Sequence, residues 1–243
     1  FLGPLLAMGL MVLWANDFRM VFWVAVIPAV LAVALLFFGV REPERPQGAK
    51  RMNPIKRENL RRLSKAYWWV VAIGGVLTMA RFSEAFLVLR AHEGGLPLAF
   101  TPLVLVAMNI VYALSAYPFG KLADSTRHTS LLAAGLVTLA AADCALAYSN
   151  HWSWMLVGIV LWGLHLGLTQ GLLATMVADT APEDLRGTAF GFFNLASGVA
   201  LLVASGLAGL IWDQMGAPFT FLAGSVFCLL ALAMIFAMPR ARS

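Results

Sequence analysis

The sequence predicts an all-α integral membrane protein, and its composition, segment lengths and charge placement each support this. The 243 residues are 61% hydrophobic and 12% charged, with a mean hydropathy of +0.82. Soluble globular domains average about 45–50% apolar and about 25% charged residues. Because lipid offers no partner to backbone polar groups, an apolar segment that crosses a bilayer must pair them internally. Each long apolar run is therefore expected to form a helix.

Eight apolar runs follow one another along the chain. A membrane helix needs about 20 residues to span the hydrocarbon core of about 30 Å. Seven runs are long enough, whereas the first is too short, so we expect a fragment of about eight helices that begins inside a transmembrane helix. The runs are Phe1–Trp14, Val21–Val40, Ala66–Leu89, Leu98–Gly120, Ser130–Tyr148, Trp154–Ala178, Ala189–Trp212 and Pro218–Met238.

A basic segment separates the second run from the third. Residues 41–65 hold nine Lys and Arg residues and three prolines, which favour a solvated linker. The positive-inside rule places this linker in the cytoplasm. Alternating from there puts fourteen of the 17 basic residues inside, together with the C-terminus. The predicted parts are a helical remnant over 1–40, the linker over 41–65 and a six-helix bundle over 66–243.

The run Ala66–Leu89 carries two charged side chains at membrane depth. Arg81 and Glu84 are three residues apart, so both lie on one face of a continuous helix, with Thr78 one turn earlier. Insertion scales assign roughly 2.5–3.5 kcal/mol to an Arg at a helix centre, so a partner or a watery cavity is expected. One interpretation is an ion pair that only supports packing. The other is a substrate or proton site, where Glu84 loads a proton once Arg81 is drawn away.

Other polar side chains recur in the later runs. His165 is either a satisfied core residue or a proton relay, because its charge changes near neutral pH. The neutral side chains either bond a neighbouring helix or line a cavity. Asp143, near the end of its run, is expected to extend to the membrane interface. The candidate pathway residues are Arg81, Glu84, Asn109, Tyr112, His165, Thr169, Gln170 and Asn194.

Three local sequences resemble the major facilitator superfamily of transporters. Gly120-Lys-Leu-Ala-Asp124 is similar to the family's signature in a short cytoplasmic loop, and Ala178–Gly191 is similar to its loop before the eleventh helix. Gly3-Pro4 resembles, in part, the kink of the fifth helix in the family's proton-coupled exporters. The resemblance implies that the eight runs are helices five to twelve. It also implies a bundle that rocks against a second bundle around a central cavity.

A cytoplasmic gate is expected where the signature meets the next loop. A helix N-terminus carries roughly half a positive charge, which attracts a nearby carboxylate. Asp124 is expected to contact the N-terminus of the helix that follows Arg186 and to hold the inner side closed. The alternative is a surface Asp that caps its own loop. The candidate gate residues are Gly120, Asp124, Arg127, Asp179 and Arg186.

The sequence favours a secondary active transporter that moves a small solute, and we expect proton-coupled export. The alternative is a non-transporting sensor or interaction protein on the same scaffold. The sequence contains no phosphate loop, metal-ligand spacing or nucleophile motif, so we expect neither an enzyme nor a cofactor, metal or nucleic acid. The expected partners are a small solute, protons and lipid. The expected state is a monomer in a bacterial inner membrane, completed by the missing N-terminal helices.

Overall fold

The computed structural model of the chain describes residues 2–14, 17–39, 57–149 and 151–238. Within these ranges every regular element is helical, seven segments are long and apolar enough to cross a membrane, and α1 is a shorter apolar helix. The predicted all-α membrane bundle is confirmed. Its elements are α1 (Leu2–Leu13), α2 (Phe18–Gly39), α3 (Arg57–Arg61), α4 (Lys65–Ala80), α5 (Ala85–Glu93), η1 (Leu98–Phe100), α6 (Pro102–Ser125), α7 (His128–Ala147), α8 (Trp152–Thr169), α9 (Leu172–Thr180), η2 (Glu183–Leu185), α10 (Arg186–Met215) and α11 (Ala217–Ala237).

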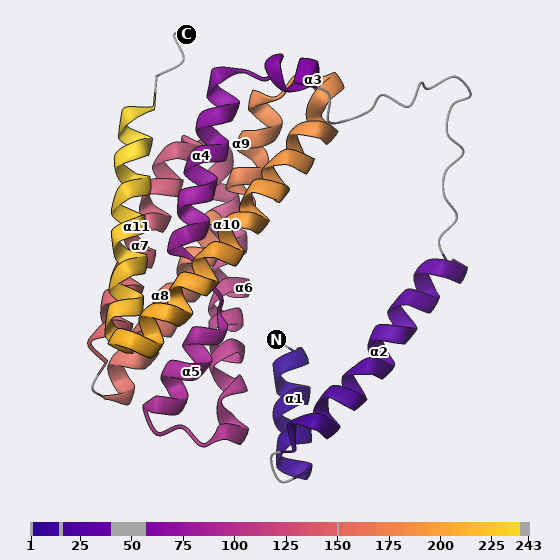
Figure 1. The fold of residues 1–243 in the computed structure, drawn as a ribbon, viewed down its shortest axis with the longest axis vertical. Helices are drawn as coiled ribbons and strands as arrows, with labels where there is room; N and C mark the ends of the chain where they lie inside the picture. Colours follow the sequence, from indigo (N-terminus) through magenta and orange to yellow (C-terminus); the bar gives the residue numbers. More distant parts are fainter. Residues whose placement is uncertain (1, 15–16, 40–56, 150, 239–243) are drawn as a thin grey trace.

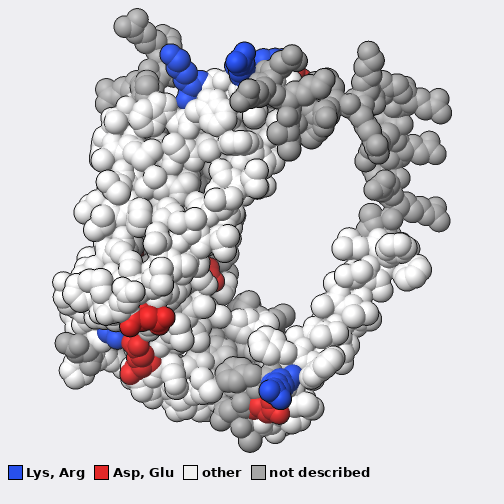
Figure 2. Space-filling model, in the orientation of Figure 1, with Lys and Arg blue, Asp and Glu red and all other residues white. Residues whose placement is uncertain are grey.

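Helices α4 to α11 form one bundle, and α1 and α2 stand beside it (Figure 1). Helix α7 packs between α8 and α11, α6 packs against α8, and α10 packs against α4 and α11. Helix α1 contacts the bundle through α6. Figure 2 shows almost all of the described charged side chains on this face at the two ends, with uncharged surface between them. Charges are costly in hydrocarbon, so this is the distribution that a membrane-spanning bundle needs.

Two of the expected continuous helices are broken. The run Ala66–Leu89 forms α4 and α5 with a gap over residues 81–84, and Trp154–Ala178 forms α8 and α9 with a gap at Gln170 and Gly171. Irregular backbone at membrane depth is tolerated only where protein buries it or where it lines a water-filled cavity. The two gaps therefore mark positions where the interior of the bundle supplies hydrogen bonds or water.

An aromatic cluster joins the first gap to three other helices. The ring of Phe82 lies 5.3 Å from Phe86, 5.8 Å from Trp162 and 5.6 Å from Phe221, between ring centroids. Trp212 of α10 completes the cluster at 5.5 Å from Phe86. Such pairs contribute roughly 0.5–1.5 kcal/mol beyond their buried area. The cluster holds the irregular segment between α4 and α5 against α8, α10 and α11.

Two of the three glycines spaced four residues apart in the α8–α9 run serve close helix packing. A Cβ at Gly163 would lie 2.5 Å from the carbonyl oxygen of Met108, and a Cβ at Gly167 would overlap Ser115, so both positions let α6 approach α8. Gly171 differs, because nothing lies within 4 Å of its added Cβ and its φ is +93°. It belongs to the turn between α8 and α9, where a left-handed φ favours glycine.

The segment Gly120–Asp124, expected in a loop, is the last part of α6. Helix α6 continues to Ser125, and only Thr126 and Arg127 separate it from α7. Helices extend beyond the hydrocarbon when polar residues at their ends meet water, which explains the longer helix. Most of the predicted linker, residues 41–56, lies outside the described residues, and its last part forms α3.

Candidate substrate and proton pathway

The gap between α4 and α5 positions Arg81 and Glu84. The backbone N–H of Arg81 makes the last helical bond, 2.9 Å to the carbonyl of Leu77, and its ψ of 66° then turns the chain out of the helix. Helix α5 begins where the hydroxyl of Ser83 accepts the N–H of Ala85 at 3.3 Å. The polar residues of this segment therefore replace a turn of regular helix.

The helix break corrects the expected relation between the two charges. Arg81 and Glu84 do not share the face of one helix, because both lie in the irregular segment, and both are half-buried. The ion pairs within the described ranges join Arg62 to Asp184, Arg90 to Glu93 and His128 to Asp179. Since none includes Arg81 or Glu84, each of these two charges is left available in this conformation.

The gap between α8 and α9 depends on the conformational freedom of a glycine backbone. The N–H of Gln170 makes the last bond of α8, 2.8 Å to the carbonyl of Leu166, and Gly171 then turns the chain. At the start of α9, the N–H of Thr175 donates a hydrogen bond to the Gly171 carbonyl at 2.9 Å. The side chain of Gln170 is exposed at this turn. It presents one neutral amide, with a donor and an acceptor, at membrane depth.

His165 and Thr169 lie between α8 and α7. The Nδ1 of His165 is 2.9 Å from the carbonyl oxygen of Gly135, and the Thr169 hydroxyl donates to the His165 carbonyl at 2.9 Å. His165 is fully buried, whereas a residue lining a cavity shared with a second bundle would be exposed in this chain alone. In this conformation the geometry matches the satisfied core histidine, one of the two sequence interpretations.

Three neutral candidates remain accessible at other places in the bundle. Asn109 of α6 is half-buried and donates from Nδ2 to the Leu105 carbonyl at 2.7 Å, within its own helix. Tyr112 is half-buried one turn later, and Asn194 of α10 is exposed. No hydrogen bond joins these side chains to Arg81 or Glu84 in the described part of the chain. The residues therefore lie on α6 and α10 without forming one preassembled cluster.

The expected gate residues lie at one end of the bundle but form different contacts. Asp124, Arg127 and Arg186 are exposed, and within the described residues no hydrogen bond or ion pair joins Asp124 to the start of α10. Asp179 pairs with His128, whose Nδ1 is 3.7 Å from its Oδ2. Gly120 is exposed on α6, with nothing within 4 Å of an added Cβ.

Two contacts at this end were missed by sequence reasoning. The guanidinium of Arg62 donates to Asp184 at 2.7 Å, and the hydroxyl of Ser64 donates to the Thr180 carbonyl at 3.1 Å. They join the start of α4 to the segment between α9 and α10. Asp184 lies in the loop before α10 that the family resemblance singled out, but its partner is 122 residues away. Such a pairing has no local sequence signal.

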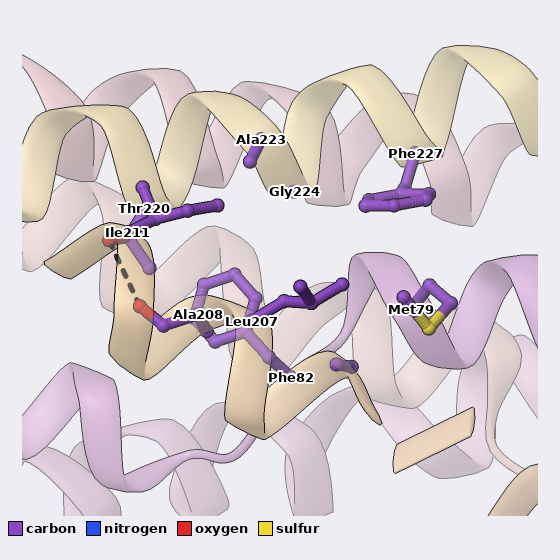
Figure 3. A pocket seen from close by; sticks show the side chains of 10 residues that line it. Met79, Phe82, Leu207, Ala208, Ile211, Thr220, Ala223, Gly224 and Phe227 are labelled. Carbon is purple, nitrogen blue, oxygen red and sulfur yellow. Dashed lines mark hydrogen bonds between the residues drawn. The ribbon is translucent and has the colours of Figure 1, made fainter. Parts of the chain in front are cut away.

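A small cavity lies between α4, α10 and α11 (Figure 3). Met79, Phe82, Leu207 and Thr220 contribute to its wall, and its volume is about 20 Å³. That volume holds about one water molecule and no organic solute. The cavity beside the aromatic cluster is therefore too small for cargo.

Asp143 differs from its expected position at the membrane interface. It lies on α7 with 0% exposure, and neither carboxylate oxygen has a hydrogen-bond partner within the described residues. The side chain cannot reach water because α11 packs over this face of α7, where Ser225 contacts the Ala140 carbonyl at 3.3 Å.

The family model of the Major Facilitator Superfamily matches residues 85–243, which include both the second gap and the candidate gate. The chain belongs to this superfamily. The expected resemblance is thereby confirmed, and a major facilitator protein is a multi-pass membrane protein of a transporter family. Seven segments of the described chain have the length and hydropathy for that arrangement.

Several curated relatives of this major facilitator chain are transporters by name. It is 28% identical over 236 residues to an uncharacterised MFS-type transporter of Methanocaldococcus jannaschii, covering 95% of this chain and 58% of that protein. It is 32% identical over 142 residues to a lysosomal dipeptide transporter of Homo sapiens, covering 55% and 30% of the two chains. A facilitated glucose transporter homolog of Caenorhabditis elegans is 33% identical over 121 residues, covering 48% and 23%. The chain spans about half the length of the first of these relatives.

Proposed function

We propose that the whole protein is a secondary active transporter that exports a small solute in exchange for protons by alternating access. The observation that carries this proposal is the charged gap between α4 and α5. Arg81 and Glu84 are half-buried there and are not paired with each other within 4.0 Å. Broken helices with free polar groups at membrane depth are the usual place where transporters bind solutes and ions.

The two charges have complementary roles in this proposal. Arg81 binds an anionic group of the solute, because a guanidinium matches the geometry of a carboxylate. Glu84 carries the proton, because a carboxylate at membrane depth exists stably when it is neutralised or paired. In the solute-free protein, a conformational change that draws Arg81 away from Glu84 removes the opposite charge and favours proton uptake there, so that a proton returns in exchange for the exported solute. Asn109, Tyr112 and Gln170 supply neutral hydrogen bonds.

His165, Thr169 and Asn194 complete the proposed pathway in different ways. Asn194 is exposed on α10 and is available to a solute. The buried pair His165 and Thr169 holds α8 against α7, so we assign it to a conformation in which these helices separate. In this assignment, His165 and Thr169 take part in the conformational change between the two states of the transporter and do not contact the solute in the conformation described here.

The gate proposal concerns the end of the bundle where Arg62 and Asp184 pair. Gly120, Asp124, Arg127, Asp179 and Arg186 would close this end when α6 and the start of α10 approach each other. Asp124 would then meet the positive N-terminus of α10. We assign this end and the C-terminus to the cytoplasm because the basic residues concentrate there. The corresponding location is a bacterial inner membrane, and the complete protein would act as a monomer.

The test is solute and proton flux in proteoliposomes that contain the full-length protein. The solute panel includes dipeptides, which carry a carboxylate for Arg81, and hexoses, which do not. A pH-sensitive dye in the vesicle lumen is expected to report proton movement when a transported solute is added. Absence of flux for every solute, with specific binding retained, would favour the alternative of a sensor.

Glu84→Gln tests the proton site directly. It is expected to abolish the dependence of transport on the pH gradient while leaving solute binding within about twofold, since the amide keeps the shape of the side chain. Glu183→Gln is the matched control, because Glu183 is exposed in the turn before α10. Transport that still follows the pH gradient in Glu84→Gln would remove Glu84 from the coupling mechanism.

A further inference from the structure

A second carboxyl group in this chain is buried without a partner. Asp143 is fully buried on α7, and both its oxygens lack a hydrogen bond within the described residues. The other described Asp side chains, at positions 17, 124, 179, 184 and 213, are exposed. An isolated ionised carboxylate in an apolar interior costs several kcal/mol, and such a group usually becomes neutral instead. The proposed transport mechanism does not use this residue.

The groups that lie next to the Asp143 carboxyl can be identified from the contacts of Gly224 on α11. A Cβ added to Gly224 would lie 2.5 Å from Oδ2 of Asp143, 3.1 Å from the Phe82 ring and 3.2 Å from the carbonyl oxygen of Ala80. The carboxyl group and the Ala80 carbonyl therefore both pack against Gly224. Gly224 also lines the water-sized cavity between α4, α10 and α11 (Figure 3).

Ala80 is the last residue of α4, so its carbonyl lacks a hydrogen-bond donor within the helix. The final carbonyls of a helix have no N–H partner inside the helix, and they carry a partial negative charge. No hydrogen bond reaches the Ala80 carbonyl in the described part of the chain. An ionised Asp143 would add a full negative charge beside this helix end, whereas a protonated Asp143 offers an O–H donor to it.

Among the described residues, no cation lies within 4.0 Å of Asp143 to favour the ionised form. Besides Asp143, the titratable groups on the packed elements are Lys65 and Tyr67 of α4, His128 and Cys144 of α7, His165 of α8, Cys228 of α11, and Arg81 and Glu84 between α4 and α5. None forms a hydrogen bond or ion pair with Asp143 within the described ranges. His165 points to Gly135, two turns away along α7.

We propose that Asp143 is a proton-binding site, a carboxylic acid whose O–H donates to the free carbonyl end of α4 at Ala80. Release converts the acid to a carboxylate and passes the proton to water, which reaches Asp143 when α11 moves away from α7. The negative charge then opposes the end of α4, so proton release loosens the segment between α4 and α5. The site borders the residue before Arg81, but it does not depend on the proposed cargo.

The test is infrared spectroscopy of the full-length protein at neutral pH. A protonated carboxylic acid has a C=O stretching band separate from the bands of carboxylates. Asp143→Asn is expected to remove one such band, whereas Asp213→Asn, which changes an exposed carboxylate on α10, is expected to leave it. An unchanged protonated-acid region in a folded Asp143→Asn protein would overturn the proposal. The measurement needs no transport activity, so its outcome is separate from that of the proposed function.

A second variant tests the contact if Asp143→Asn fails to fold. Gly224→Ala leaves Asp143 in place but directs a methyl group at its Oδ2 and at the Ala80 carbonyl. It is expected to shift the frequency of the band, because the hydrogen bond from the acid is disturbed. Gly209→Ala on α10 is the matched control, since nothing lies within 4 Å of its added Cβ. A band that is absent from the unmutated protein, or that does not move in Gly224→Ala, would overturn the assignment.

Discussion

The two broken spans of this bundle interrupt apolar helices by different means. Between α4 and α5 the chain leaves the helix for four residues that include Arg81 and Glu84, and Ser83 starts the next helix with its hydroxyl. Between α8 and α9 two neutral residues suffice, because Gly171 adopts a φ of +93°. The first break introduces charged side chains, and the second uses the conformational freedom of glycine. Only the first therefore supplies ionic chemistry at membrane depth.

The breaks also lie at different depths. Helix α4 runs 16 residues before its break, which is roughly 24 Å, and α9 runs 9 residues after its break, which is roughly 14 Å. The start of α4 and the end of α9 lie side by side, because Ser64 bonds the Thr180 carbonyl. The charged break is thus roughly 10 Å farther from the Arg62 end than the neutral one. A solute that contacts both would lie along the membrane normal.

The largest expected effect separates the charged break from the neutral one. Arg81→Ala is expected to lower transport by roughly 10- to 150-fold, since a hydrogen bond to a charged group contributes about 1.5–3 kcal/mol. Gln170→Ala removes a neutral partner worth about 0.5–1.5 kcal/mol, which corresponds to roughly 2- to 10-fold. Initial transport rates per folded protein measure both, with Asp213→Ala at an exposed position of α10 as control. Equal losses of transport in Arg81→Ala and Gln170→Ala would contradict the proposal that only the first break supplies ionic contacts to the solute.

The helices that precede the breaks are expected to tolerate an added methyl group unequally. At Gly163 of α8 the new Cβ meets the Met108 carbonyl at 2.5 Å, which is backbone, whereas at Gly74 of α4 it meets the end of the Phe193 ring at 2.6 Å. A ring can rotate away, but α6 would have to move. Gly163→Ala is expected to cost about 1–3 kcal/mol and Gly74→Ala less than about 1 kcal/mol. Thermal unfolding in detergent measures the order, and the reverse order would contradict the packing described here.

The turn at the second break offers a smaller and more local test. Gly171→Ala places a side chain at a left-handed φ, which costs about 1–2 kcal/mol. Gly75→Ala is the matched substitution inside α4, where nothing lies within 4 Å and helix propensity favours Ala by about 1 kcal/mol. The two variants are expected to shift the unfolding temperature in opposite directions. A stabilising Gly171→Ala would mean that α8 and α9 form one continuous helix.

The sequence predicted the bundle well because lipid imposes one strong requirement, that long apolar segments form helices. It predicted the two helix breaks poorly. A serine such as Ser83 is also common inside a membrane helix, and a glycine such as Gly171 is also common where two helices pack closely. The burial of Asp143 depends on α11, whose Gly224 is 81 residues away, so no local pattern reports it. The pairing of Arg62 with Asp184 is hidden for the same reason. The hydropathy of each segment therefore predicts its helix. Which polar side chains lack a partner depends on contacts between residues far apart in the sequence.

The smallest expected effect concerns the residue that starts α5. The Ser83 hydroxyl accepts the Ala85 N–H at 3.3 Å, which is long for a hydrogen bond, so Ser83→Ala is expected to cost about 0.5 kcal/mol, at the low end for a net hydrogen bond. Ser83→Gly, which removes the same hydroxyl, is the matched variant. Thermal unfolding measures the pair, and transport is expected to change little because Arg81 and Glu84 remain. A loss of transport as large as that of Arg81→Ala would mean that the Ser83 hydroxyl, and not the charges, sets the function of the first break.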